Sequence, residues 1–117
     1  MTVALALALA GCGGLQAYEG PRLPPEARAV VVADPAFSAG LPVAVILRKA
    51  DETSVPVGRS SVELAPGRHS FLVDCRVAES GGTTRHVVEA EVEPGQAYRL
   101  EAQATARGCE RVLLVPR

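Results

Sequence analysis

Aromatic side chains and lysine are scarce in this sequence, and tryptophan is absent. Only 3% of the 117 residues are aromatic, namely Tyr18, Phe37, Phe71 and Tyr98. Sites for nucleic acid rely on aromatic rings for base stacking, so the chain holds little material for such a platform. Of the 12 basic residues only Lys49 is a lysine, the arginines are scattered singly, and the formal net charge is −1. We therefore expect neither nucleic acid nor an anionic membrane surface to be an electrostatic partner.

Sequence motifs of catalysis are missing as well. Ser60, Ser61 and Ser70 are available as nucleophiles, but no Gly-x-Ser-x-Gly sequence surrounds them, and no glycine-rich phosphate loop occurs. Asp74 and Glu89 are candidates for an acid–base pair, yet both fall on strand faces that are predicted to be exposed to solvent. We expect a protein that is not an enzyme and that carries no cofactor.

The stretch from Met1 to Gly11 has no charged residue, and leucine alternates with alanine in it. A helix of this length spans roughly 16 Å, about half of what a bilayer core requires. Since the stretch has no polar face, it does not fit an amphipathic core helix, and it is typical of the apolar region of a secretory signal peptide. Signal peptides normally begin with basic residues, so we expect Met1 to be a misassigned start with such residues upstream.

The next residues carry a resemblance to a known class. Leu9-Ala10-Gly11-Cys12 resembles the lipobox of bacterial lipoproteins, in which small residues precede a cysteine that accepts a diacylglyceryl group. The resemblance implies a signal peptide over residues 1–11 and lipid on Cys12, each buried CH₂ contributing about 0.8 kcal/mol to membrane affinity. It implies a cell-envelope protein, and Gly13 is compatible with the periplasmic face of the outer membrane. An ordinary cleaved signal peptide is the alternative.

Residues 13–27 contain three glycines and three prolines. Because Pro-rich segments are extended and semi-rigid, we expect residues 12–27 to form a lipidated tether that contributes nothing to the core. The run Pro21-Arg22-Leu23-Pro24-Pro25 also resembles a polyproline ligand, but readers of such ligands are rare outside the cytoplasm, which favours the linker.

From residue 28 onward the pattern is that of β-strands. Short runs of β-branched residues alternate with turn residues, and no helical periodicity occurs. The spacing predicts one all-β domain over residues 28–117, a small antiparallel β-sandwich of about seven strands. The expected strands are 28–33, 42–49, 61–64, 70–77, 84–93, 96–104 and 110–115.

Two Pro-Gly pairs, Pro66-Gly67 and Pro94-Gly95, follow strands in similar contexts and predict type II turns. We expect the second turn to close a hairpin whose register follows from the alternation of apolar and charged residues. The expected pairs are Val92 with Tyr98 and Ala90 with Leu100 on the buried face, and Glu91 with Arg99 on the exposed face.

A second resemblance covers most of the remaining chain. The segment from Ala44 to Cys75 is similar to the PEGA-type β-sandwich module, in which a strand, a turn near an aspartate and a second strand lead to a Leu-x-Pro-Gly-x-His/Tyr turn, here Leu64 to His69. The Val-Asp-Gly turn of that family is replaced by Lys49-Ala50-Asp51-Glu52. Residues 18–31 followed by such a module are also similar to small bacterial lipoproteins. The resemblance implies a binding module of the cell surface or envelope and no catalytic residues.

Two cysteines remain once Cys12 is assigned to lipid. In an oxidising compartment Cys75 and Cys109 are expected to form a disulfide, since Cys75 shares the inward face of its strand with Phe71 and Val73. The sharper alternative is a metal site, for which the available donors are Cys75, Cys109, His69 and His86. No Cys-x-x-Cys or His-x₃-His spacing supports it.

Each of the two histidines is expected to be solvated, His69 in a turn and His86 at a strand start. Glu89, Glu91 and Glu93 are expected to form an exposed row, and nothing else converges on them to make a cation site. No metal is therefore expected.

These expectations combine into one function. We expect a lipid-anchored envelope protein whose sandwich is a non-catalytic binding or structural module, with the membrane reached through Cys12 and another envelope protein or a glycan as partner. The alternative is a receptor for a small ligand or glycan that uses loops at one end of the sandwich. An unpaired edge strand favours protein partners by strand addition, whereas a large apolar pocket favours the receptor.

Overall fold

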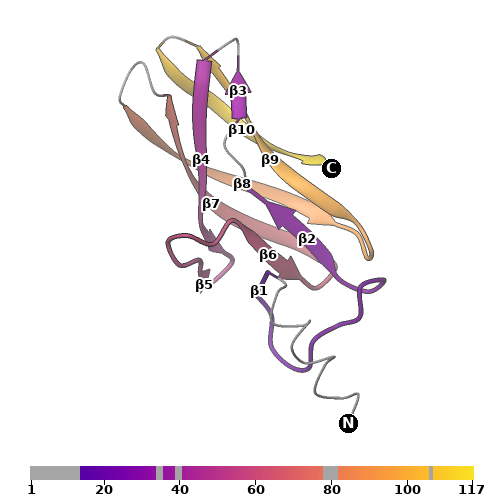
Figure 1. The fold of residues 1–117 in the computed structure, drawn as a ribbon. Coiled ribbons are helices and arrows are strands. Elements are labelled where there is room, and N and C mark those ends of the chain that lie inside the picture. Colours follow the sequence, from indigo (N-terminus) through magenta and orange to yellow (C-terminus); the bar gives the residue numbers. More distant parts are fainter. Residues whose placement is uncertain (1–13, 34–35, 39–40, 78–81, 106) are drawn as a thin grey trace.

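The computed structural model describes residues 14–33, 36–38, 41–77, 82–105 and 107–117. Within these ranges the chain is all-β, and two sheets pack face to face as a small β-sandwich, as expected (Figure 1). The expectation of purely antiparallel pairing is wrong, because residues 30–32 pair in parallel with residues 97–99, and residues 15–16 pair in parallel with residues 62–63. The described residues contain no helix that is long and apolar enough to cross a membrane. The expected signal peptide over residues 1–11 and the lipid site Cys12 lie outside the described residues.

All seven expected strands are present, and three strands of two or three residues were missed. Sheet A has the order β1-β6-β2-β9-β10, and sheet B has the order β3-β4-β7-β8 with β5 paired to the end of β4. The strands of sheet A are β1 (Leu15–Gln16), β2 (Ala29–Val32), β6 (Ser61–Leu64), β9 (Ala97–Thr105) and β10 (Gly108–Pro116). Those of sheet B are β3 (Ala36–Ser38), β4 (Leu41–Ala50), β5 (Thr53–Ser54), β7 (Gly67–Val77) and β8 (Thr83–Val92).

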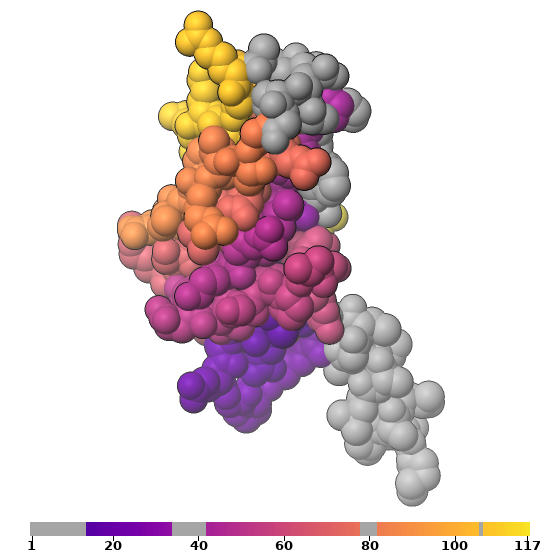
Figure 2. All heavy atoms as spheres, turned by 90° about the vertical axis from the view of Figure 1, so that its left-hand side faces the viewer, coloured from indigo at the N-terminus to yellow at the C-terminus, as the bar shows by residue number. Residues whose placement is uncertain are grey.

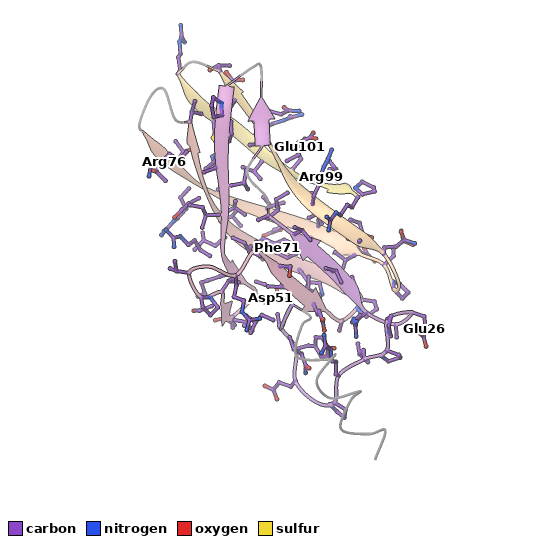
Figure 3. All side chains as sticks on the ribbon, in the orientation of Figure 1. Glu26, Asp51, Phe71, Arg76, Arg99 and Glu101 are labelled. Atoms are coloured by element: carbon purple, nitrogen blue, oxygen red, sulfur yellow. A yellow bond between two sulfur atoms is a disulfide. The ribbon has the colours of Figure 1, made fainter. Side chains whose placement is uncertain are left out.

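The core lies between the sheets and follows the two-residue alternation of the strands. In β7 the buried side chains include Phe71, Val73 and Val77, and in β9 they include Tyr98 and Leu100. The phenol of Tyr98 is satisfied in this position because its oxygen accepts a hydrogen bond from the Glu93 N–H at 2.9 Å. The outward faces of the two sheets lie on opposite sides of the molecule, as Arg76 on sheet B and Arg99 on sheet A show (Figure 3).

The two Pro-Gly turns carry the chain from one sheet to the other, and they do not close hairpins. Gly67 and Gly95 have φ angles of 128° and 75°, so the positive φ that the turns demand is present. However, β8 pairs with β7 in sheet B, whereas β9 pairs with β2 and β10 in sheet A. The expected pairs Val92–Tyr98, Ala90–Leu100 and Glu91–Arg99 are therefore wrong, and Arg99 instead donates to Glu101 on its own strand at 2.8 Å (Figure 3).

The segment expected to be a tether is folded onto the sandwich from residue 14 onward. Leu15 and Gln16 form β1, which pairs in parallel with Val62 and Glu63 of β6. Ala17 is buried in the core cluster, and its N–H donates to the carbonyl of Glu63 at 2.9 Å. In the space-filling view this N-terminal part of the chain forms one end of the molecule, directly below the central strands (Figure 2). The expectation that this segment contributes nothing to the core is wrong.

Candidate functional site

A buried carboxylate fastens the N-terminal segment to sheet A. Glu63 lies in the short strand β6 and is only 2% exposed, because the N-terminal segment covers the face that would otherwise meet solvent. Its carboxylate accepts two hydrogen bonds from the guanidinium of Arg22, one of them from Nε at 3.0 Å. A second guanidinium, that of Arg28, lies 3.8 Å from the same carboxylate. We call Arg22, Arg28 and Glu63 the N-terminal lock.

The electrostatics of the N-terminal lock follow from this geometry. The hydrogen bond to Glu63 raises the pKa of Arg22 above its ordinary value. The loop between the two arginines is also held, because Arg28 donates to the Leu23 carbonyl at 2.9 Å and the Leu23 N–H donates to the Tyr18 hydroxyl at 2.9 Å. Glu63 could not be identified from the sequence, since a carboxylate between two apolar strand residues is normally exposed. Arg22, the partner of Glu63, lies in a proline-rich run that indicated a linker.

A second buried carboxylate lies on the outward face of sheet B. Asp74 was expected to be exposed, but it is only 5% exposed because Arg48 of β4 and Arg85 of β8 fold over it from both neighbouring strands. Arg48 Nε lies 2.8 Å from Asp74 Oδ2, and Arg85 Nε lies 2.9 Å from Oδ1. The hydrogen bonds from Arg85 lower the pKa of Asp74 to about 2, with Arg48 adding to the effect.

The acid–base pair considered from the sequence is not formed. Asp74 is opposite Arg85, while Glu89 is opposite Ser70 on the same pair of strands. Glu89 is exposed and lies 3.2 Å from Arg68. With Asp74 held as a carboxylate by two guanidinium groups, the pair has neither the proximity nor the protonated member that acid–base chemistry needs.

His69 belongs to strand β7 and is mostly buried, with 12% of its side chain exposed, so the expectation of a solvated turn residue is wrong. Its Nδ1 lies 2.5 Å from Asp51 Oδ2, and its Nε2 lies 2.6 Å from the carbonyl of Ala65. The other oxygen of Asp51 accepts a hydrogen bond from the Ser70 N–H at 2.9 Å. Asp51 adopts a φ of 53° at the tight turn after β4, and these bonds hold it there (Figure 3).

His86 lies in β8, where its Nε2 is 2.8 Å from the hydroxyl of Thr84. In the part of the chain that the structure describes, no hydrogen bond joins a histidine to the hydroxyl of Ser60, Ser61 or Ser70. The contacts of His69 therefore hold Asp51 in the β4–β5 turn, and none of them is to a serine hydroxyl.

The expected disulfide is present. Cys75 of β7 and Cys109 of β10 are bonded, with their Cα atoms 6.2 Å apart, and the bond joins sheet B to sheet A. Because both sulfur atoms are used, the four donors considered for a metal site cannot act together. Across the described ranges, no group of three or more His, Cys, Asp or Glu side chains is placed to hold a metal ion. Glu89, Glu91 and Glu93 are all exposed, as expected.

The remaining candidate is a surface, the free edge of β8. This strand is the last in sheet B and pairs only with β7 among the described strands. It runs for 10 residues without proline, glycine or a register shift. In its middle, Val87 is 64% exposed. An unpaired row of backbone N–H and C=O groups of this length is a ready template for another strand.

Comparison of the chain with protein-family models, with curated proteins and with solved structures gives no significant match. The lipobox-like and PEGA-like resemblances of the sequence therefore stay predictions.

Proposed function

We propose that this chain is a lipid-anchored protein of the bacterial cell envelope whose β-sandwich is a non-catalytic module that binds a protein partner by strand addition. The observation that carries the binding role is the long, uninterrupted free edge of β8 with exposed Val87 at its middle. Strand addition supplies affinity through backbone hydrogen bonds, and side chains on the two faces supply selectivity.

Two further observations support the location. The sequence Leu9-Ala10-Gly11-Cys12 behind an uncharged apolar stretch supports lipid on Cys12 and anchoring at the periplasmic face of the outer membrane. The Cys75–Cys109 bond supports an oxidising compartment, because such bonds persist outside the cytosol and are rare within it.

The location is tested on the protein purified from membranes. Mass spectrometry of the mature N-terminus is expected to find a chain that begins at Cys12 and carries diacylglyceryl and acyl groups. Cys12→Ser is expected to abolish the lipid without changing the melting curve, since residue 12 precedes the first strand, which begins at Leu15. A mature protein that begins elsewhere, or a free Cys12 thiol, contradicts the anchor.

The binding role is tested separately in intact cells. A photoreactive amino acid in place of Val87 is expected to give covalent adducts of defined mass, and the same group in place of Val57 serves as the matched control. Val57 is 90% exposed but lies in a loop outside the sheets, so it reports random collisions. Equal labelling from both positions would contradict binding at the edge.

A further inference from the structure

Among the long edge strands that the structure describes, β8 is the least protected against pairing. The edge strand β10 of sheet A has a register shift between Cys109 and Arg111 and ends at Pro116, which has no N–H to donate. On the other side of sheet B, β3 and β5 are only three and two residues long. Bulges, prolines and short strands block edge-to-edge contacts, and β8 has none of them. Charged side chains are a further means, and β8 carries Arg85, Glu89 and Glu91, whose opposite signs allow pairing with a strand of complementary charge order.

The hydrogen-bonding direction of β8 follows from its neighbour β7. The N–H and C=O of Ser70 both bond to Asp51, which lies on the β4 side of β7. Ser70 is opposite Glu89, so these two residues form a pair without mutual backbone hydrogen bonds. The N–H and C=O of Glu89 therefore point to the free edge. Because the β7–β8 register has no shift, the same holds at every second residue, including Val87 and Arg85.

We propose that two copies of this chain associate by antiparallel pairing of β8 with β8, centred on Val87. The inference rests on the proposed role of this edge and names its partner. In this register Val87 lies opposite Val87 of the second copy, and the two residues exchange two N–H···O bonds. The opposite residues Arg85 and Glu89 exchange two such bonds as well. The order of charges on β8 fits this register, since Arg85 and Glu89 are equidistant from Val87.

Charge complementarity is met twice in this arrangement. Arg85 of each copy lies opposite Glu89 of the other copy. Within each copy Arg85 also bonds to Asp74, and Glu89 to Arg68, but both side chains reach solvent, with 62% and 59% of their area exposed, so each can add a partner across the axis. Centring the pair on Glu89 would place Glu89 against Glu89 and Val87 against Glu91. Centring it on Arg85 would place two arginines in contact. Both alternatives bring like charges together or lose the apolar contact, and both are disfavoured.

The outward face of sheet B also becomes continuous across the axis. Leu72 is the neighbour of Val87 on β7, and Lys49 is the neighbour of Leu72 on β4. Pairing at Val87 therefore makes an apolar row of two leucines and two valines across both copies, with a lysine at each end. Contact between the two Val87 side chains covers part of one of the three large apolar side chains that are exposed in the described chain.

The pairing places the two N-terminal segments far apart. Within one copy, Gly95 follows β8 and bonds to the Arg28 carbonyl at 2.9 Å, so the N-terminal segment lies near the Val92 end of the strand. Antiparallel strands bring this end to the Thr83 end of the partner, so the segments are separated by roughly 30 Å along the ladder. In the lipid-anchored form both copies are confined to one surface, which raises their effective concentration for pairing.

The register is tested by cross-linking with the full chain purified in detergent. In a Cys12→Ser background, Val87→Cys and Glu89→Cys are compared with a short bis-maleimide. Residues 87 lie in contact across the axis, whereas residues 89 are separated by roughly 14 Å, so only the first variant is expected to give a covalent dimer. Stronger cross-linking of the second variant, or none of either, would overturn the proposal.

Association itself is measured by light scattering over a dilution series. The full chain is expected to be in monomer–dimer equilibrium, and Val87→Lys is expected to raise the dissociation constant roughly tenfold or more, because two lysines then meet on the axis. Val57→Lys is the matched control and is expected to change nothing. A monomer at every concentration excludes self-pairing, and adducts with another protein in the cell assay would then leave the binding role standing with a different partner.

Discussion

Asp74 shows at the scale of one residue how a surface face can hold a buried charge. Two guanidinium groups replace the water that the carboxylate loses, and their long side chains stay partly solvated while they cover it. The pKa of about 2 in the folded protein, against an ordinary value of 3.8, means that folding favours the ionised form. This contribution to stability is present above the unfolded pKa and is lost as the pH falls through the range from about 4 to 2.

For Asp74→Asn we expect a loss of about 2 kcal/mol in the free energy of unfolding at neutral pH, from the linkage between pKa and stability. Urea melts at a series of pH values check it, and the difference from the wild type should shrink to near zero at pH values close to the folded pKa of about 2. Glu89→Gln removes an exposed carboxylate from the same face and is the control, expected to have little effect. A difference that persists unchanged in acid would contradict the ion-pair account.

The two crossing turns give a second residue-scale prediction. Gly67→Val and Gly95→Val force a β-branched residue to positive φ and are expected to lower stability by about 1 to 3 kcal/mol each. The cost should be larger at Gly95, because its added Cβ would lie 3.2 Å from the Glu26 carbonyl oxygen, whereas nothing lies within 4 Å at Gly67. Gly95→Asn, which tolerates this φ better, should lose less. Thermal melts that rank the variants otherwise would refute the ordering.

At the scale of the element, the N-terminal lock determines whether residues 14–27 belong to the domain. Glu63→Gln leaves Arg22 and Arg28 beside a neutral amide, and the segment should open more readily, since charged hydrogen bonds contribute about 1.5 to 3 kcal/mol each. We expect trypsin to cut after Arg22 roughly tenfold faster or more, because the segment opens locally before the whole domain unfolds. Glu101→Gln, which removes an exposed carboxylate paired with Arg99, should leave the cutting rate unchanged. Equal rates would show that backbone pairing alone holds the segment.

The strands could be predicted from the sequence, and their partners could not. Alternation reports whether a side chain points inward, and Val92 and Tyr98 do point inward, but from different sheets. The same pattern fits a hairpin within one sheet and a turn that leads from one sheet to the other. The residues of the Pro-Gly turns therefore do not show which of the two connections they make. The alternation also predicts that Cys75 points inward, and this part of the prediction needs no knowledge of strand partners. The predicted disulfide with Cys109 is confirmed.

The ionic contacts were beyond prediction for a related reason. Arg48 lies at a register shift of β4, which turns its side chain toward Asp74 and breaks the alternation on which a sequence prediction depends. Glu63 has its partner 41 positions earlier, in a segment whose prolines indicated a linker. Long-range pairs between single charges leave no periodic signal, and only the fold brings them together.

At the scale of the whole molecule, the Cys75–Cys109 bond adds a covalent link between the two sheets to the chain crossings and the shared core that already join them. Changing both cysteines to alanine is expected to lower the free energy of unfolding by about 2 to 5 kcal/mol, mainly because the unfolded chain gains freedom. Urea melts of the variant and of the reduced wild type should agree with each other. Two alkylatable thiols in the folded wild-type protein, found by peptide mapping without reductant, would show that the bond does not form.

The position of β2 in sheet A has a consequence for the rate of folding. This strand pairs with β6 on one side and β9 on the other, so residues 29–32 acquire their neighbours only from residues 61–64 and 97–99. The antiparallel pairs β7–β8 and β9–β10 join neighbouring segments and can form early, whereas insertion of β2 requires distant segments to meet first. Proteins dominated by such non-local contacts fold in milliseconds to seconds. We therefore expect Val31→Ala, at the centre of β2, to act mainly by accelerating unfolding and to leave the refolding rate nearly unchanged.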